Sequence, residues 1–387
     1  MRLLFVADGR SPIALNWIEY FTKGEHEVHL ASTFACRTNL SVASLHFVPV
    51  AFSAAAGETT RAGRGLRGLV PTSLRTQLRS WVGPLTLGPA AKRLAELIGK
   101  LKPDLVHALR IPYEGMLAAA AQTDVPLLVS VWGNDFTLHA RANPFMAAAT
   151  RRTLRLAAAL HTDSQRDQRL ADEWGFDRSK PALVLPGNGG VRTEIFYPAN
   201  AEPKELRVVN PRGLRAYVRN DVFFQAIPKV LRQLPEVRFD CPDMQGEPEA
   251  QRWVQQLDIA QQVHLLPKLS APTLAQTYRA AQVMVSPSTH DGTPNSLLEA
   301  MACGVFPVCG DLESIGEWIR DGKNGLLVDP NDPDALAAAM VNAMKNKDLR
   351  ESAAGINKQL ISERANYPKN MQRVEAFYSE LSNDVRT

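Results

Sequence analysis

Short apolar runs alternate with helix-forming segments along nearly the whole chain, and this alternation limits the fold more than any other feature. In the first half, the runs expected to be strands cover residues 3–7, 27–32, 104–109, 126–133, 159–164 and 181–187. The segments expected to be helices cover 11–24, 90–103, 114–122 and 150–159. Strands that alternate with helices form a parallel, helix-covered sheet, so we expect an α/β fold with functional residues just past the strand ends.

The second half repeats the pattern after a polar, proline-containing stretch, residues 196–205, which is the expected linker. Expected strands cover 205–210, 237–240, 263–266, 282–286, 304–310 and 325–330, and expected helices 222–234, 251–257 and 273–281. A final helical region over 361–381 is interrupted at Pro368. A chain of 387 residues is long enough for two ordinary domains, so we predict two parallel-sheet units.

The composition is typical of soluble globular proteins, with 45% hydrophobic and 22% charged residues. No apolar run approaches the roughly 18 residues that cross a bilayer. The amino terminus reaches Asp8 after a short apolar run, so we expect a first strand rather than a secretory signal. The four cysteines show no paired metal-ligand spacing, and free thiols in a reducing compartment are the expected state. These features predict a cytoplasmic protein.

A basic segment lies in the first half. Residues 59–95 contain no acid but seven Lys and Arg residues, and Leu74, Leu78, Trp81 and Val82 recur there at helical spacing. A basic amphipathic stretch with a Trp can lie on an anionic membrane, so 61–82 is a candidate for peripheral contact with the cytoplasmic membrane face. The alternative is a loop, or a helix packed on its own domain. We expect no nucleic-acid partner, because base-stacking aromatics are not interleaved with the arginines.

The segment 286–304, SPSTHDGTPNSLLEAMACG, says most about function. It follows an apolar run that reads as a buried strand, and Thr293 as cap, Pro294 in the first turn and Gly304 at the far end predict a helix. The loop from Gly292 to Pro294 and the amides of Asn295, Ser296 and Leu297 would then face an anionic ligand at the helix start. Glu299 lies too far inside the helix to cap it, so its carboxylate is available to a hydroxylated group such as a ribose. The segment therefore predicts a nucleotide site.

This segment resembles the donor-site signature of the retaining glycosyltransferases with the GT-B fold, specifically glycosyltransferase family 4. The family pattern is an acid, seven intervening residues, a Glu and a small-residue helix of the type EAMACG; here the acids are Asp291 and Glu299. The family usually has Glu where this chain has Asp291. The resemblance implies that Glu299 binds the ribose hydroxyls and that Asp291 stands beside the transferred sugar. The alternative is that both acids have no ligand and lie near a helix N-terminus only because negative charge is favourable there.

The resemblance also implies a domain plan of two Rossmann-like domains that face each other across a cleft. An acceptor-side domain would cover 1–197 and a nucleotide-sugar domain 198–365. The C-terminal helix, over 366–387, would cross back to the first domain.

Two strand ends of the first half carry further candidates. Gly9, Arg10 and Ser11 follow the first strand, where Gly9 allows a tight turn and Ser11 with Pro12 starts a helix. By resemblance this loop approaches the donor phosphates or the acceptor, although a plain turn is the alternative.

The second strand end, VWGND, supplies Gly133, Asn134 and Asp135. The resemblance places Gly133 and Asp135 at the cleft near the transferred sugar; alternatively Asp135 caps a helix. His107 either faces the cleft or is a core histidine with satisfied hydrogen bonds.

The loop 210–221 after the first strand of the second half is rich in arginine. By resemblance a basic pair here neutralises the diphosphate. Arg212 matches the first position, and Arg215 or Arg219 fits the second. Fixed cationic donors suit a leaving group with about two negative charges. The alternative is a solvated loop.

The resemblance, together with these features, implies a retaining, metal-independent hexosyltransferase. The donor would be a UDP- or GDP-linked sugar and the acceptor a hydroxyl of a glycan or a lipid-linked compound. No His/Asp/Glu cluster has metal-ligand spacing, so no metal or other cofactor is expected. Three alternatives stay open: a two-carboxylate glycoside hydrolase, an epimerase-like GT-B protein, and a non-catalytic protein that binds a sugar nucleotide.

Overall fold

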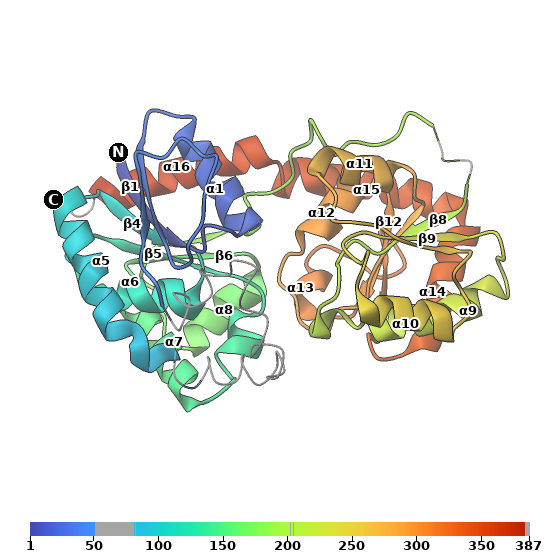
Figure 1. The fold of residues 1–387 in the computed structure, drawn as a ribbon. Helices are drawn as coiled ribbons and strands as arrows, with labels where there is room; N and C mark the ends of the chain where they lie inside the picture. Colours follow the sequence, from blue (N-terminus) through green and yellow to red (C-terminus); the bar gives the residue numbers. More distant parts are fainter. Residues whose placement is uncertain (51–80, 82, 202, 204, 384–387) are drawn as a thin grey trace. The chain divides into compact units, whose positions relative to one another are not determined.

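The computed structural model describes residues 1–50, 81, 83–201, 203 and 205–383. The chain forms two compact units (Figure 1). Unit 1 comprises residues 1–189 together with 371–387, and unit 2 comprises residues 190–370. The first boundary therefore lies eight residues before the one that we expected at 197.

Unit 1 is built on a parallel seven-stranded sheet with the order β3-β2-β1-β4-β5-β6-β7. Its strands are β1 (Arg2–Ala7), β2 (Glu27–Ser32), β3 (Ser44–Phe47), β4 (Leu105–Ala108), β5 (Leu127–Val131), β6 (Ala159–Thr162) and β7 (Ala182–Val184). Its helices are α1 (Pro12–Thr22), α5 (Leu87–Leu101), α6 (Met116–Ala121), α7 (Pro144–Leu156), α8 (Gln165–Glu173) and most of α16 (Tyr367–Asn383). Short turns η1 (Gly83–Thr86), η2 (Ile111–Gly115) and η3 (Asp135–His139) complete it.

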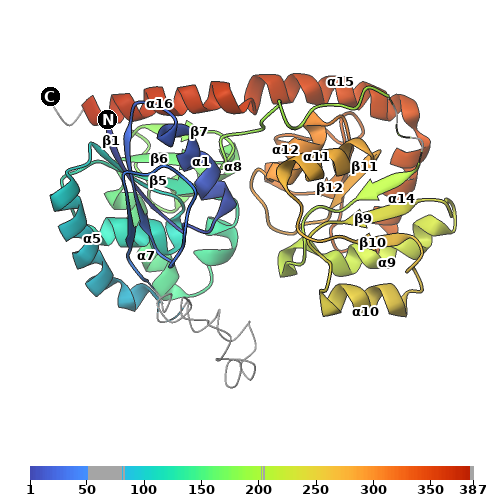
Figure 2. The ribbon, with the colours of Figure 1, turned by 45° about the horizontal axis from the view of Figure 1, so that its top comes forward.

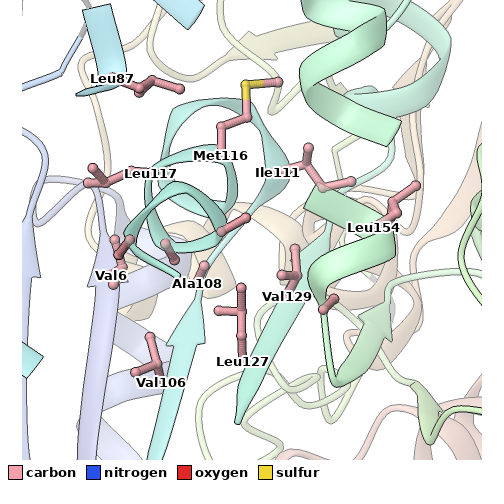
Figure 3. Close-up of a cluster of buried hydrophobic side chains, with 14 of the residues drawn as sticks. Val6, Leu87, Val106, Ala108, Ile111, Met116, Leu117, Leu127, Val129 and Leu154 are labelled. Carbon is pink, nitrogen blue, oxygen red and sulfur yellow. The ribbon is translucent and has the colours of Figure 1, made fainter. Parts of the chain in front are cut away.

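Helices cover both faces of this sheet because successive side chains of a strand point to opposite faces. Leu4 and Val6 of β1 belong to a buried cluster with residues of α5, α6 and α7 (Figure 3). Phe5, between them, contacts Phe21 of α1 and Tyr378 of α16 instead. In Figure 2, α16 accordingly lies above the strands of unit 1 and α7 below them.

Unit 2 holds a parallel six-stranded sheet with the order β10-β9-β8-β11-β12-β13. Its strands are β8 (Arg207–Val209), β9 (Arg238–Cys241), β10 (Val263–Leu265), β11 (Val283–Ser286), β12 (Phe306–Gly310) and β13 (Leu326–Val328). Its helices are α9 (Asn220–Leu231), α10 (Pro248–Gln256), α11 (Ala271–Arg279), α12 (Asn295–Ala302), α13 (Glu313–Gly316), α14 (Pro333–Lys345) and α15 (Lys347–Arg364), and η4 (Ala216–Val218) is a short turn.

The predicted fold class, two parallel Rossmann-like sheets with helices, is confirmed. The last helix packs on unit 1, as the resemblance implied: Tyr378 of α16 is fully buried and its hydroxyl accepts a hydrogen bond from Trp17 Nε1 at 2.9 Å. The strand β3 and the helices α8, α13 and α14 were not predicted, and α15 was predicted only at its end.

Candidate functional site

The candidate donor site lies in unit 2, at the carboxyl ends of its two central strands. The order of that sheet reverses between β8 and β11, so the loops that follow these strands lead away to opposite sides. Such a switch point is where open parallel sheets bind ligands. Thr289, in the loop after β11, donates from its amide and its hydroxyl to the carbonyl of Tyr217, in the loop after β8, at 2.8 and 3.2 Å. The two loops are thus joined at the switch point.

The helix α12 starts one residue later than we predicted. Pro294, with an extended backbone, is the cap residue, and the helix begins at Asn295. Thr293 does not cap the helix; its hydroxyl accepts a hydrogen bond from Trp318 Nε1 at 3.1 Å. The Leu297 amide, expected to face a ligand, donates to the Pro294 carbonyl at 3.0 Å. The amides of Asn295 and Ser296 make no hydrogen bond with the described residues, so these two can bind an anion.

Two glycines fix the ends of this region. Gly304 follows α12 in a left-handed conformation, with φ +78°, as the predicted helix end requires. At Gly310 of β12, a Cβ atom would lie 2.4 Å from the carbonyl oxygen of Ser288. Only a residue without a side chain allows the loop after β11 to pass so close to β12.

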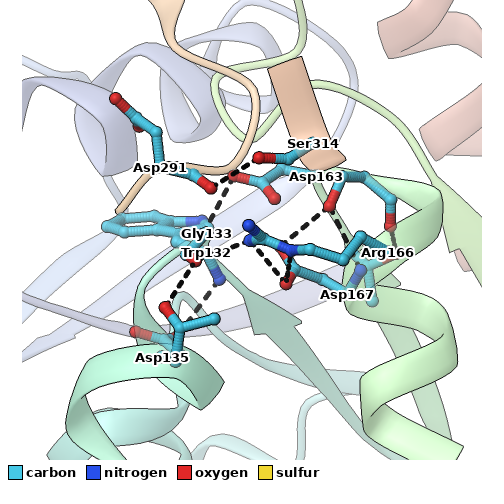
Figure 4. Close-up of polar contacts among 11 residues, drawn as sticks. Trp132, Gly133, Asp135, Asp163, Arg166, Asp167, Asp291 and Ser314 are labelled. Atoms are coloured by element: carbon cyan, nitrogen blue, oxygen red, sulfur yellow. Dashed lines mark hydrogen bonds and ion pairs between the residues drawn. The ribbon is translucent and has the colours of Figure 1, made fainter. Parts of the chain in front are cut away.

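Arg212 connects the two loops directly. Its Nη2 donates to Asp291 Oδ2 at 2.6 Å and its Nη1 to Ser296 Oγ at 3.3 Å. Ser314 Oγ donates to the Asp291 carbonyl at 2.8 Å (Figure 4). The Asp291 side chain and the Arg212 guanidinium are largely buried, so this ion pair orients both groups. The structure thus brings together Arg212, Asp291 and Ser296.

The carboxyl group of Glu299 is available as a hydrogen-bond acceptor. Its side chain is half-buried on α12, and its carboxyl group makes no hydrogen bond or ion pair with the described residues. Burial raises the pKa of Glu299 to about 8, and the nearby charge of Arg212 only partly opposes this shift. A ligand that donates hydrogen bonds to this buried, unpaired carboxyl group would stabilise its charged form.

The two arginines that we left as alternatives differ in availability. Arg219 donates to both carboxylate oxygens of Asp221 at 2.9 Å and also contacts Asn331. Arg215 is exposed and makes no side-chain hydrogen bond or ion pair with any residue that the structure describes. A ligand could bind Arg215 directly, whereas Arg219 would first have to leave Asp221. The assignment of either residue to the diphosphate stays a prediction.

In unit 1, the loop after β1 forms the predicted turn. Ser11 caps α1, accepting from the Ala14 amide at 3.4 Å, and Pro12 opens the helix. The Gly9 amide donates to Ser32 Oγ at 3.0 Å, and a Cβ at Gly9 would collide with Ser32 and Cys36. Arg10 forms a two-pronged ion pair with Asp8 at 2.9 Å.

The loop after β5 is held by contacts within unit 1 (Figure 4). Asp135 is fully buried and opens η3 rather than capping it, since Asn134 is the cap residue. Its carboxylate accepts from Arg110 Nη2 at 2.7 Å and from the amides of Ile111 and Trp132 at 3.2 Å. The contact of Asp135 with a ligand stays a prediction, because both of its oxygens already serve the loop.

Three residues after β6 were not predicted as site residues, although they lie at or just past the end of an expected strand. Asp163 accepts from the Gly133 amide at 3.1 Å, and Arg166 donates to the Gly133 carbonyl at 2.7 Å and to Asp167 (Figure 4). Burial raises the pKa of Asp163 well above its usual value, and the nearby Asp167 adds to this effect. These side chains position Gly133 from the neighbouring strand.

Glu114 is a second residue that sequence reasoning missed. It is buried in η2, after β4, and accepts from Thr33 Oγ1 at 2.6 Å. Burial raises the pKa of Glu114 to about 7. Its neighbour Tyr113 has a positive φ of 70°, which is unusual for a bulky residue. Nothing in the sequence marks this glutamate, because it stands among apolar residues without a motif.

His107 is a core histidine and not a cleft residue, which corrects its place among the cleft candidates. It is fully buried, with Nδ1 2.5 Å from the Tyr378 hydroxyl and Nε2 2.8 Å from Ser130 Oγ. Ser130 Oγ also lies 2.8 Å from His161 Nδ1. Burial lowers the pKa of His107 well below its ordinary value, so the ring is neutral.

The basic segment 61–82 lies outside the described residues apart from Trp81, and its contact with a membrane stays a prediction. Within the described ranges, the helices are all too short or too polar to cross a bilayer. In the same ranges, no group of three His, Cys, Asp or Glu side chains is arranged to hold a metal ion.

Two family models match the chain. The "Glycosyl transferase 4-like domain" model matches residues 9–187, and the "Glycosyl transferases group 1" model matches residues 213–346. A D-inositol 3-phosphate glycosyltransferase of Geodermatophilus obscurus is 29% identical over 48% of this chain and 45% of its own length. The O-antigen chain mannosyltransferase B of Escherichia coli is 40% identical over 21% of this chain and 20% of its own. The matches thus span about half or less of these curated relatives.

Solved structures share the whole fold. Sucrose-phosphate synthase from Thermosynechococcus elongatus superposes with a TM-score of 0.77 at 16% identity, over 98% of both chains. Anabaena HepE in complex with UDP-glucose superposes with a TM-score of 0.71 at 15% identity, over 98% of this chain and 100% of its own. At these identities the likeness concerns the fold.

Proposed function

Because the chain belongs to family 4 of the GT-B-fold glycosyltransferases, we propose that it transfers a hexose from a UDP- or GDP-linked sugar to a hydroxyl of a glycan or a lipid-linked acceptor. In this proposal the anomeric configuration is retained. One observation carries it: at the switch point of unit 2, the available Glu299 carboxyl, the Arg212 guanidinium and two free helix amides belong to one cluster of loops. Such a set matches a nucleoside diphosphate, which offers hydroxyl donors at one end and anionic oxygens at the other.

The donor roles follow from the chemistry of each group. Glu299 accepts hydrogen bonds from the ribose hydroxyls, which favours its charged form. Arg212, Arg215 and the amides of Asn295 and Ser296 stabilise the charge that builds up on the leaving diphosphate. Asp291, oriented by Arg212, stands beside the transferred sugar.

The acceptor side of the proposal concerns the carboxyl edge of unit 1. The loops after β1 and β5 present Arg10 and the Trp132–Gly133 turn there, on a frame fixed by buried hydrogen bonds. We assign acceptor contacts to these loops. The acceptor hydroxyl attacks on the face that the diphosphate leaves, and a departing phosphate oxygen takes its proton. The arginines and amides supply the positive charge that the diphosphate needs, so activity should persist in a chelating buffer.

The relatives support this reading. HepE was solved with UDP-glucose, and the matching Geodermatophilus protein is a D-inositol 3-phosphate glycosyltransferase. Both names describe proteins that handle sugars or sugar nucleotides.

The test starts with a panel of nucleotide sugars, because a ligand at a hundredfold over its Kd stabilises the folded protein by about 2.7 kcal/mol. For the donor identified by the thermal shift, calorimetry should show that Glu299→Ala weakens binding by about 2–3 kcal/mol, roughly 30- to 150-fold in Kd. Glu249→Ala, an exposed acid on α10, is the matched control and should bind as the wild type does. Unchanged affinity of Glu299→Ala would overturn the ribose role.

The reaction itself is tested by nucleotide release. Release should depend on an added acceptor, and the product should keep the donor's anomeric configuration by NMR. Binding of the sugar nucleotide without any acceptor-dependent nucleotide release would favour the non-catalytic alternative. A reaction of the sugar nucleotide that requires no acceptor would favour the epimerase-like alternative. Cleavage of an aryl glycoside without any nucleotide would favour a hydrolase.

A further inference from the structure

An apolar groove runs along the outer surface of unit 1, between the helices α5 and α7. Its first part is a cavity of about 600 Å³. The short helix α6 packs against both α5 and α7, and its residues line the cavity between them. Alanines from all three helices line the cavity: Ala91, Ala95, Ala119, Ala120, Ala121, Ala148 and Ala149. Because α6 has only six residues and mostly methyl side chains, the space between its neighbours stays open.

The groove continues beyond this cavity. A second cavity of about 410 Å³ shares Ala119 with the first and reaches the C-terminal ends of α5 and α7. Its lining includes Ile98, Leu127 and the exposed Leu156. One acid, Asp124, lines this second part. The groove is therefore long and apolar, and the end formed by the second cavity carries no positive charge in its lining.

The first part of the groove carries the positive charge. Lys92 and Arg152 line it, both are exposed, and neither makes an ion pair with a described residue. The three helices together contain six cationic residues and a single acid, Glu96. The cationic residues are Lys92, Arg93, Lys100, Arg151, Arg152 and Arg155. A ligand with an anionic head at this end would meet unpaired cations.

Two exposed aromatic rings border the same end. Phe145 lines the first cavity, and Trp81 packs against it edge to face, with the ring centroids 5.8 Å apart. Trp81 is 50% and Phe145 43% exposed. Exposed aromatics beside a basic surface are typical of proteins that rest at the boundary between water and lipid.

We propose that the groove holds one acyl chain of an anionic phospholipid, with the lipid phosphate at Lys92 and Arg152, and that unit 1 docks on an anionic membrane through α5 and α7. The lining of alanine methyls suits a methylene chain, whose burial is favourable for each carbon. The excess of cations attracts an anionic bilayer surface. This site is distinct from the switch-point site of unit 2 and does not depend on the transfer reaction.

The first experiment measures sedimentation of the full chain with phosphatidylglycerol or phosphatidylcholine vesicles. The wild-type protein should sediment with phosphatidylglycerol vesicles and remain in the supernatant with phosphatidylcholine vesicles. Lys92→Glu with Arg152→Glu should weaken binding at least 20-fold, since each basic residue near an anionic surface contributes about fivefold. Arg232→Glu with Arg252→Glu, two exposed arginines of unit 2, makes the same change in net charge and should have little effect.

The second experiment separates the contribution of the lipid acyl chain to binding from that of the lipid head group. Ala148→Phe fills the groove from an exposed position and keeps both cations, so it should weaken vesicle binding about tenfold. Ala338→Phe, at an exposed alanine of α14, is its matched control. Lysophosphatidylglycerol should compete with the vesicles, whereas glycerol phosphate should not. Circular dichroism melts check that each variant is folded.

Three results would overturn the proposal. Loss of binding with the charge variant but not with Ala148→Phe would mean surface attraction without an acyl chain. Binding that survives both variants but disappears when the arginines of 61–82 are neutralised would assign the membrane contact to that segment. Failure to bind phosphatidylglycerol vesicles at all, including a case in which the groove binds a peptide or a second copy instead, would exclude the lipid.

Discussion

Glu299 is the residue whose protonation is set most directly by its surroundings at the donor site. Burial raises its pKa to about 8, so in the free protein the carboxyl group is mostly protonated at pH 7. Hydrogen bonds from ribose hydroxyls favour the charged form and lower this pKa. The binding of a nucleotide and the loss of a proton are therefore linked at this residue.

We expect nucleotide binding at pH 7 to release close to one proton, because Glu299 changes from mostly protonated to charged. The release should fall toward zero above about pH 9, where the free carboxyl is already charged. Calorimetric titrations in two buffers with different ionisation enthalpies measure it. Glu299→Gln should release none, and a wild type that releases no proton would contradict the assigned contact.

At the scale of the elements, the position of the donor loop depends on the close approach of the loop after β11 to Gly310 of β12. A methyl group there would lie 2.4 Å from the Ser288 carbonyl oxygen, so the loop that carries Asp291 would have to move. We expect Gly310→Ala to lower the free energy of unfolding by about 1–3 kcal/mol and to weaken nucleotide binding. Urea denaturation and calorimetry measure the two effects.

Gly316→Ala provides the control for this prediction. A Cβ at Gly316 would meet nothing within 4 Å, and the residue ends a short helix. Its replacement should be neutral or slightly stabilising. Equal behaviour of the two variants would mean that the contact at Ser288 does not limit the loop.

The sequence allowed most elements to be predicted because the buried strands of a parallel sheet are continuous apolar runs. The edge strand β3 lacks such a run: its residues alternate between half-buried and exposed, and two of its four are polar. The helix α8, QRDQRLADE, buries only four of nine residues, so it shows little apolar periodicity. In both cases tertiary contacts decide the conformation.

The site was predictable only where a local motif describes it. Glu299 and Arg212 were found because each stands in a recognisable loop or helix. Glu114 and Asp163 depend on contacts with Thr33 and Gly133, which are 81 and 30 residues away. His107 could not be placed because a core and a cleft histidine occupy similar strand positions, and only the fold brings Tyr378 to its side.

At the scale of the whole molecule, a buried chain of hydrogen bonds ties α16 to the sheet of unit 1. It runs from Trp17 through Tyr378, His107 and Ser130 to His161, whose Nε2 lies 3.0 Å from the Leu185 carbonyl. Burial lowers the pKa of His161 to about 4. Both histidines are therefore neutral when the protein is folded and take up protons when it unfolds in mild acid.

We expect the free energy of unfolding of unit 1 to fall as the pH falls from about 6.5 to about 4. In this range the unfolded chain binds protons that the folded His161 and His107 do not. His161 alone costs up to about 1.4 kcal/mol per pH unit and roughly 3 kcal/mol in all, and His107 adds to this loss. Urea denaturation at pH 7, 6 and 5 measures the slope. His161→Gln should be less stable at pH 7 but show a shallower slope, and an unchanged slope would contradict the role of this ring.

Unit 1 combines an early and a late segment of the sequence, which has a consequence for its synthesis. A ribosome makes the strands of unit 1 first but the helix that completes their second face last. Unit 2, an unbroken segment of the chain, can therefore finish folding while the earlier part still exposes the surface around Trp17 and Phe21 to solvent or to a chaperone. A stop codon a few turns early would leave that surface uncovered for the lifetime of the protein.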